Sequence, residues 1–122
     1  MRLLALDIGR RHTGIAYYDD AMGIPLPLDT LTHDSSEELC AYLQQLSQQR
    51  GIDRVIVGLP LLPSGKEGAQ AQFVRDVGAM LEKAGMDLSY LDERYTTPRQ
   101  TQGDGNAAAA CSLLEMALRN YI

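Results

Sequence analysis

The feature that most constrains the fold is the run Val55-Ile56-Val57, which is β-branched and apolar on both faces. A strand of this kind is typical of the centre of a parallel sheet that is covered by helices on both sides. We therefore expect an α/β fold with a strand over residues 53–58 at its centre.

Helical signals occur in three stretches. Ser35 and Glu38 fit a capping box, and Gly51 follows the apolar periodicity as a C-terminal cap. Ser64 and Glu67 fit a second capping box. The expected helices cover about residues 36–50; the stretch from Ser64 to Gly85, with Phe73, Val77, Met80, Leu81 and Ala84 inward; and residues 107–121, with Ala110, Leu113, Leu114, Ala117 and Leu118 inward.

Three strand signals precede the first expected helix, and another lies near the end of the chain. Residues 2–8 and 13–18 are separated by a short turn, which predicts an antiparallel pair. Residues 24–31 carry Pro25 and Pro27, so we expect a third, irregular strand at an edge. With residues 87–92 as the last strand, the predicted order is β-β-β-α-β-α-β-α, a mixed five-stranded sheet with helices on both faces.

Length and composition favour one domain, residues 1–122, because 122 residues with 45% apolar content suffice for one core only. Apolar stretches are too short for a membrane span, so we expect a cytoplasmic protein without membrane contact. Cys40 and Cys111 are expected to be buried free thiols. The net charge of −5 disfavours nonspecific binding to nucleic acid, although the cations of the predicted loops would form a local basic rim: Arg10, Arg11, Lys66, Arg94 and Arg99.

Asp7 is the most informative polar position, since it interrupts an otherwise apolar strand near its carboxyl end. It could simply accept hydrogen bonds from the following turn. However, Asp92 and Glu93 close the last strand at the same predicted edge, and gathered carboxylates suit hard cations such as Mg²⁺ or Mn²⁺. Two such ions, about 4 Å apart, would activate water for phosphodiester hydrolysis.

Nucleophilic catalysis by a side chain is not indicated, because no Ser/His/Asp or Cys/His set is recognisable. His12 and His33 fall in predicted loops, where each is expected to be solvated. His12 lies beside Arg10 and Arg11 and could also touch phosphate.

Three groups of residues occur in an order that resembles the YqgF/RuvX family of RuvC-like resolvases. They are Leu6-Asp7-Ile8-Gly9 with Gly14-Ile15-Ala16; Val57-Gly58-Leu59-Pro60 with Gly65-Lys66-Glu67-Gly68; and Asp92-Glu93-Arg94-Tyr95-Thr96-Thr97. Together they span essentially the whole chain.

The resemblance implies a ribonuclease-H-like fold and a Mg²⁺-dependent nuclease that matures the 5′ end of pre-16S ribosomal RNA or resolves Holliday junctions. Its partner would be structured RNA or branched DNA, and the protein itself a monomer or weak homodimer. Asp7 would be the first metal ligand and Glu93 the second. The residues 58–68 would face substrate through backbone amides and Lys66, and the remaining expected contacts are Arg94, Thr96 and Thr97.

The third acid of the family is expected where the last helix opens, and two alignments compete for it. The spacing to the apolar pair Leu113-Leu114 selects Asn106, whereas the nearest carboxylate is Asp104. Asn coordinates a cation through its carbonyl oxygen without adding charge. Either residue would also serve as a helix N-cap with no catalytic role.

Three functions therefore remain open from the sequence. The first is an endonuclease with Asp7, Glu93 and Asp104 or Asn106 around two divalent ions. The second is a catalytically impaired family member that acts as a nucleic-acid or protein binding module in ribosome assembly or DNA repair. The third, a relative of the actin and sugar-kinase ATPases, is disfavoured because those enzymes clamp nucleotide between two such domains.

Overall fold

The sheet is built around β1 (Arg2–Ile8), which pairs antiparallel with β2 (His12–Asp19) and parallel with β5 (Arg54–Leu59). The apolar run predicted to be central lies in β5, which also pairs parallel with β6 (Leu88–Asp92). The order across the sheet is β3-β2-β1-β5-β6. The computed structural model describes residues 1–92 and 105–121, and confirms the predicted mixed sheet.

The predicted third strand is divided into two. β3 (Leu26–Pro27) and β4 (Leu31–Thr32) each pair antiparallel with β2, so the described part of the chain contains six strands rather than five. Proline has no amide hydrogen for a strand ladder, which limits pairing around Pro25 and Pro27 to a short edge segment. The edge position was predicted correctly, and the break was missed.

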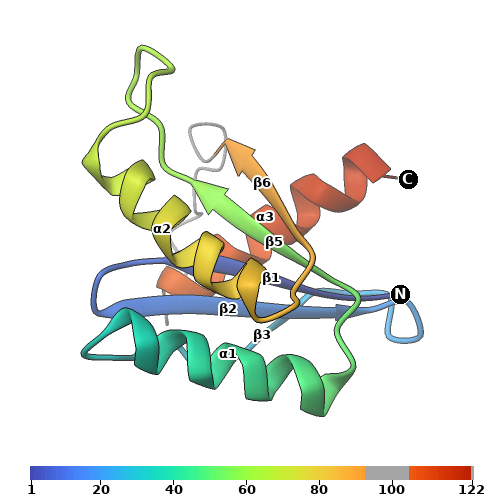
Figure 1. The fold of residues 1–122 in the computed structure, drawn as a ribbon. Coiled ribbons are helices and arrows are strands. Elements are labelled where there is room, and N and C mark those ends of the chain that lie inside the picture. The colour runs from blue at the N-terminus through green and yellow to red at the C-terminus, as the bar shows by residue number, and fades with distance from the viewer. Residues whose placement is uncertain (93–104, 122) are drawn as a thin grey trace.

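Helices cover both faces of the sheet, as predicted. α1 (Ser36–Arg50) and α2 (Ala69–Lys83) lie on one face, and α3 (Gly105–Tyr121) lies on the other (Figure 1). The Ser35 hydroxyl accepts a hydrogen bond from the Glu38 amide, and Gly51 ends α1 with a left-handed φ of 62°. The capping signals therefore placed the first helix correctly.

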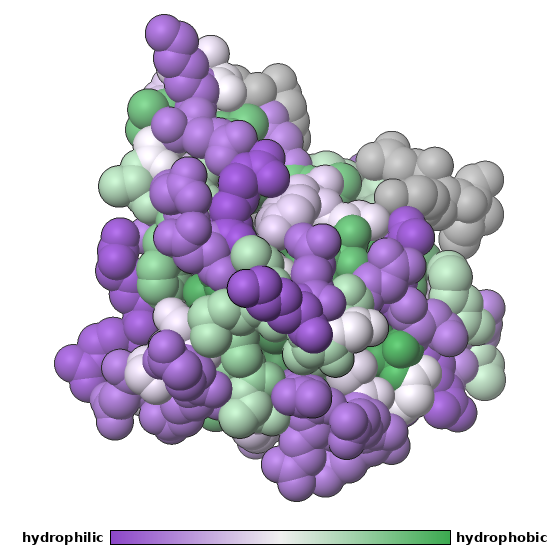
Figure 2. All heavy atoms as spheres, viewed as in Figure 1, coloured by the Kyte–Doolittle hydropathy of each residue, from purple (hydrophilic) through white to green (hydrophobic). Residues whose placement is uncertain are grey.

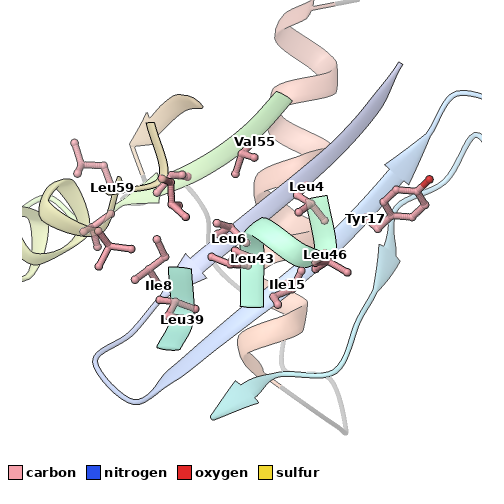
Figure 3. Close-up of a cluster of buried hydrophobic side chains, with 14 of the residues drawn as sticks. Leu4, Leu6, Ile8, Ile15, Tyr17, Leu39, Leu43, Leu46, Val55 and Leu59 are labelled. Atoms are coloured by element: carbon pink, nitrogen blue, oxygen red, sulfur yellow. The ribbon is translucent and has the colours of Figure 1, made fainter. Parts of the chain in front are cut away.

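Two apolar cores correspond to the two faces. Between the sheet and the α1–α2 layer lie side chains that include Leu4, Leu6 and Ile8 of β1, Ile15 of β2 and Leu39 and Leu43 of α1 (Figure 3). Between the sheet and α3 lie Leu3, Ala5, Ala16, Ile56, Ala110, Leu113, Leu114 and Ala117. The small alanines of α3 allow its backbone to approach the sheet closely, which fixes this helix against β1 and β2.

The second capping box was predicted wrongly. α2 begins at Ala69, and its N-cap is Gly68, which has no side chain to bond the first turn. The Ser64 hydroxyl instead accepts from the Lys66 amide at 3.4 Å, and Glu67 pairs with Arg75. A reversal of the chain before the helix uses the residues of the predicted box. The buried stripe of α2 is also rotated, since Ala71, Val74, Val77, Gly78 and Leu81 are buried.

Both cysteines are free and only partly buried, and burial raises the pKa of each thiol. Among the described helices, none combines the length and apolar character needed to cross a membrane.

Candidate functional site

Asp7 lies one residue before the end of β1, opposite Gly14 of β2. Successive side chains of a strand point to opposite faces. Because Leu6 and Ile8 pack in the α1–α2 core and Ala5 packs in the α3 core, Asp7 belongs to the α3 face. It is half-buried there, at the carboxyl end of a central strand. This is the position that the sequence predicted for a ligand-binding carboxylate.

A tight turn follows Asp7. The Gly9 amide donates to the His12 carbonyl oxygen at 3.0 Å, and a Cβ on Gly9 would lie 2.5 Å from that same oxygen. The turn therefore requires glycine. Gln70, in the first turn of α2, donates from Nε2 to the Ile8 carbonyl oxygen at 3.5 Å. Helix α2 thus contacts the backbone that carries Asp7.

The two arginines of this turn diverge toward different helices. The Arg10 guanidinium lies over the Phe73 ring of α2, 4.7 Å from its centroid. Arg11 forms an exposed ion pair with Asp34, just before α1, with 3.4 Å between Nη2 and Oδ1. Both residues therefore lean toward the α1–α2 side of the edge, whereas Asp7 belongs to the α3 side.

The β5–α2 loop projects beyond the carboxyl end of β5 (Figure 1). The Leu62 amide donates to the Lys66 carbonyl oxygen at 2.9 Å, and the Gly65 amide donates to Leu62 at 2.8 Å. Gly65 adopts a φ of 87°, which closes the reversal. The projection is largely hydrophilic in Figure 2. Because these amides are used inside the loop, the exposed Lys66 side chain is the better candidate for an outside anion than the backbone amides expected from the sequence.

Asp92, the acid at the end of the last described strand, is separated from Asp7 by the sheet itself. Asp92 ends β6 in register with Leu59. Leu88 and Tyr90 pack in the α1–α2 core, so alternation assigns Asp92 to that face, opposite to Asp7. Glu93 follows in sequence and lies outside the described residues, as do Arg94, Thr96, Thr97, Arg99 and Asp104. Within the described ranges, no group of three His, Cys, Asp or Glu side chains could hold a metal ion.

Position 106 belongs to the first turn of α3, because the helix begins at Gly105. Residue 106 precedes Ala110 by four residues and Leu113 by seven, and both are fully buried against the sheet. Asp104 directly precedes the helix.

His33 lies in the loop between β4 and α1, as predicted, but the prediction that it is solvated was wrong. Its side chain is 1% exposed, and its Nε2 lies 2.9 Å from the buried Thr13 hydroxyl. The partner that makes this burial acceptable is Thr13 of β2, twenty residues earlier, so the sequence around His33 gave no local signal of it. His12 is exposed, as predicted, but it is the first residue of β2 rather than a loop residue, and its Nδ1 lies 3.1 Å from the Thr32 hydroxyl.

Comparison with known proteins gives a consistent result. The model of a family described as Holliday junction resolvase, RuvX, matches residues 1–120. A Chloroflexus aurantiacus protein described as "Putative pre-16S rRNA nuclease" is 38% identical over 96 residues; the match covers 78% of this chain and 63% of that protein. An Anaeromyxobacter protein with the same description is 31% identical, and the match covers 94% of each chain.

Among solved structures, Thermus thermophilus RuvC in complex with a Holliday junction substrate has a TM-score of 0.67 at 10% identity, covering 99% of this chain and 96% of that one. A second Thermus thermophilus RuvC structure has a TM-score of 0.64 at 11% identity, covering 99% and 97%. These similarities confirm the predicted ribonuclease-H-like, RuvC-type fold.

Proposed function

Because the chain belongs to the RuvX family, we propose that it is a divalent-metal-dependent endonuclease that cleaves structured nucleic acid. The relatives are named for pre-16S rRNA, and the structural neighbour was solved with a Holliday junction. Both are folded nucleic acids with a phosphodiester to be hydrolysed. The substrate of this chain would be one of the two, met in the cytoplasm.

The observation that carries the proposal is the position of Asp7. A half-buried carboxylate at the carboxyl end of a central strand lies at the edge where open α/β sheets bind their ligands. Asp7 stands beside a glycine turn that holds two arginines, so a carboxylate for cations and guanidinium groups for phosphates come from one short segment. This combination favours phosphodiester chemistry over a purely structural aspartate.

The donor set fits Mg²⁺ or Mn²⁺ in chemical type, because these ions prefer carboxylate oxygens. Asp7 would hold them with Glu93 and either Asp104 or Asn106, the assignment made from the sequence. Two bound ions would neutralise charge on the phosphodiester and lower the pKa of water. Arg10, Arg11 and Lys66 would bind flanking phosphates, joined by Arg94, Thr96 and Thr97 if these follow the family pattern.

The test compares wild type with Asp7→Asn on two substrates, an RNA with the precursor 5′ end and a four-way DNA junction. Mn²⁺ and Mg²⁺ are titrated separately. Cleavage that depends on the ion and falls at least about 100-fold in Asp7→Asn is expected, since removing a metal-site interaction costs 10- to 100-fold even in the outer shell. Equal activity of the two proteins, or none with any ion, would refute the nuclease.

A binding module is the second candidate, and position 106 is the observation that favours it. If Asn106, in the first turn of α3, stands where the family has an acid, the site lacks one negative charge. Such a protein would bind nucleic acid or an assembly partner without cleaving. Nucleic-acid binding that is unchanged by Asp7→Asn, together with no heat of Mn²⁺ binding in calorimetry, would favour this alternative.

A further inference from the structure

Arg10 differs from four other arginines of the described residues, which pair with carboxylates. Arg2, Arg11, Arg54 and Arg75 each form an ion pair with a carboxylate. Within the described part of the chain, the contact recorded for Arg10 is with the Phe73 ring, at 4.7 Å. The plane of its guanidinium is thus supported, while no acid among the described residues forms an ion pair with it.

Phe73 is fixed by the core on its other side. It packs partly buried against the α1–α2 core, and the adjacent Val74 is fully buried. Gln70, one turn earlier on α2, bonds the Ile8 carbonyl oxygen. The helix therefore holds both the backbone before Arg10 and the side chain beneath it, which limits the rotamers available to a long, exposed arginine.

We propose that Phe73 is a positioning residue that holds Arg10 for a backbone phosphate of the bound nucleic acid, on the α2 side of the Asp7 edge. The inference rests on the proposed function. A stacked guanidinium keeps its in-plane N–H donors free, and these donors match phosphate oxygens in pairs. Stacking before binding also reduces the side-chain entropy that binding would otherwise cost.

The geometry predicts an effect on binding rather than on the chemical step. Arg10 leans toward α2, away from the face that carries Asp7. Phe73→Leu should therefore raise KM and leave kcat nearly unchanged, because the loss is in ground-state binding. Phe73→Tyr keeps an aromatic face and should restore the wild-type KM.

The experiment measures the affinity of a labelled four-way DNA junction and a labelled RNA hairpin, in Ca²⁺, at several salt concentrations. Removing one phosphate contact lowers the magnitude of the slope of log K against log[salt] by about 1. We expect this loss in Arg10→Ala, a smaller loss in Phe73→Leu, and no loss in Phe73→Tyr. In the Arg10→Ala background, Phe73→Leu should have no further effect on the slope, as coupled residues behave in a double-mutant cycle.

A matched control is Arg50→Ala. Arg50 also lies over an aromatic ring, that of Tyr17, at 4.6 Å. It is the last residue of α1, and its carbonyl oxygen accepts from Arg2 at the start of β1, the opposite end of the strand from Asp7. Its removal should leave the salt slope unchanged. Thermal unfolding of each variant separates a lost contact from a lost fold, and only folded variants enter the cycle; Phe73→Met replaces Phe73→Leu if the latter unfolds.

Four outcomes are distinguishable. Binding with a slope that Arg10→Ala or Phe73→Leu leaves intact refutes the positioning role and spares the nuclease. Binding without cleavage refutes the nuclease, while the cycle still decides the role of Phe73. No binding of either probe by wild type refutes both. Equal defects in Phe73→Tyr and Phe73→Leu would show that aromatic stacking is not the cause.

Discussion

The Thr13 hydroxyl and Nε2 of His33 lie 2.9 Å apart, and both residues are buried beside the edge that carries Asp7. The His33 amide also donates to the Arg11 carbonyl oxygen at 2.8 Å. The other ring nitrogen, Nδ1, is buried with no hydrogen-bond partner among the described residues. The pair therefore links the segment before α1 to the turn after β1. Among the described residues, the imidazole has no acceptor for a proton on its second nitrogen.

The first prediction concerns pH. Burial lowers the pKa of His33 below its ordinary value of 6.5; His12 acts in the same direction, and Glu38 and Asp34 oppose it. The unfolded chain then binds more protons than the folded one as the pH falls below 6.5, so the free energy of unfolding decreases there. Urea midpoints of wild type should fall between pH 7.5 and 5, and those of His33→Gln should fall less.

The second prediction separates the buried hydroxyl from an exposed one. Thr13→Val leaves Nε2 of His33 without its partner and should cost about 1–3 kcal/mol of unfolding free energy. Thr32→Val removes the exposed contact with His12 and should change stability by less than about 0.5 kcal/mol. Chemical denaturation of both variants checks the difference. Equal losses of unfolding free energy would mean that burial of the Thr13 hydroxyl does not explain its contribution to stability.

The third prediction concerns the turn after Asp7. In Gly9→Ala the new Cβ would press against the His12 carbonyl oxygen, and overpacking of this kind costs about 1–3 kcal/mol. The displaced turn should also weaken nucleic-acid binding measured on the folded protein. Gly23→Ala is the control, because its φ of 78° strains alanine by about 1–2 kcal/mol while nothing lies within 4 Å of the added atom. It should lose stability and keep binding.

The fourth prediction concerns Gly78, where helix α2 passes over β6. A Cβ there would collide with the Tyr90 hydroxyl, so Gly78→Ala should be destabilising even though alanine is the better helix former by about 0.8–1.0 kcal/mol. Tyr90→Phe removes the colliding oxygen and keeps the ring under Arg75. In that background Gly78→Ala should be tolerated, with a coupling of at least about 0.5 kcal/mol in the cycle. Additive losses would contradict it.

Local signals predicted α1 correctly because its ends are decided by residues next to them. Ser35 bonds the Glu38 amide, and Gly51 takes the left-handed conformation that ends the helix. The same pattern at Ser64 and Glu67 failed because a distant partner competes: Arg75, two turns into α2, bonds Glu67. Because the Glu67 carboxylate is bonded to Arg75, it cannot complete the capping box. The chain reverses before the helix, and α2 begins at Ala69.

The strand edge expected to carry the site was predicted correctly, because it follows from strand order. Parallel pairing of β1, β5 and β6 brings the carboxyl ends of these strands to one edge, as the sequence order implied. Which face a residue occupies depends on register to a single position, and this separates Asp92 from Asp7. His33 was missed because its burial comes from β2, twenty residues earlier, where Thr13 supplies the bond that makes a buried imidazole acceptable.

The last prediction decides between the two alignments of the third acid. If position 106 is the ligand position, Asn106→Asp adds a charge in the first turn of α3 and should increase Mn²⁺-dependent cleavage by ~10-fold or more. Asp104→Asn should then have little effect. An acid in the first turn also interacts favourably with the helix dipole, so Asn106→Asp should not lose stability. In the opposite outcome, Asp104→Asn abolishes cleavage, and Asn106→Asp changes neither cleavage nor the Mn²⁺ affinity measured by calorimetry. The ligand is then Asp104, because only a residue that binds the ion alters both cleavage and Mn²⁺ affinity.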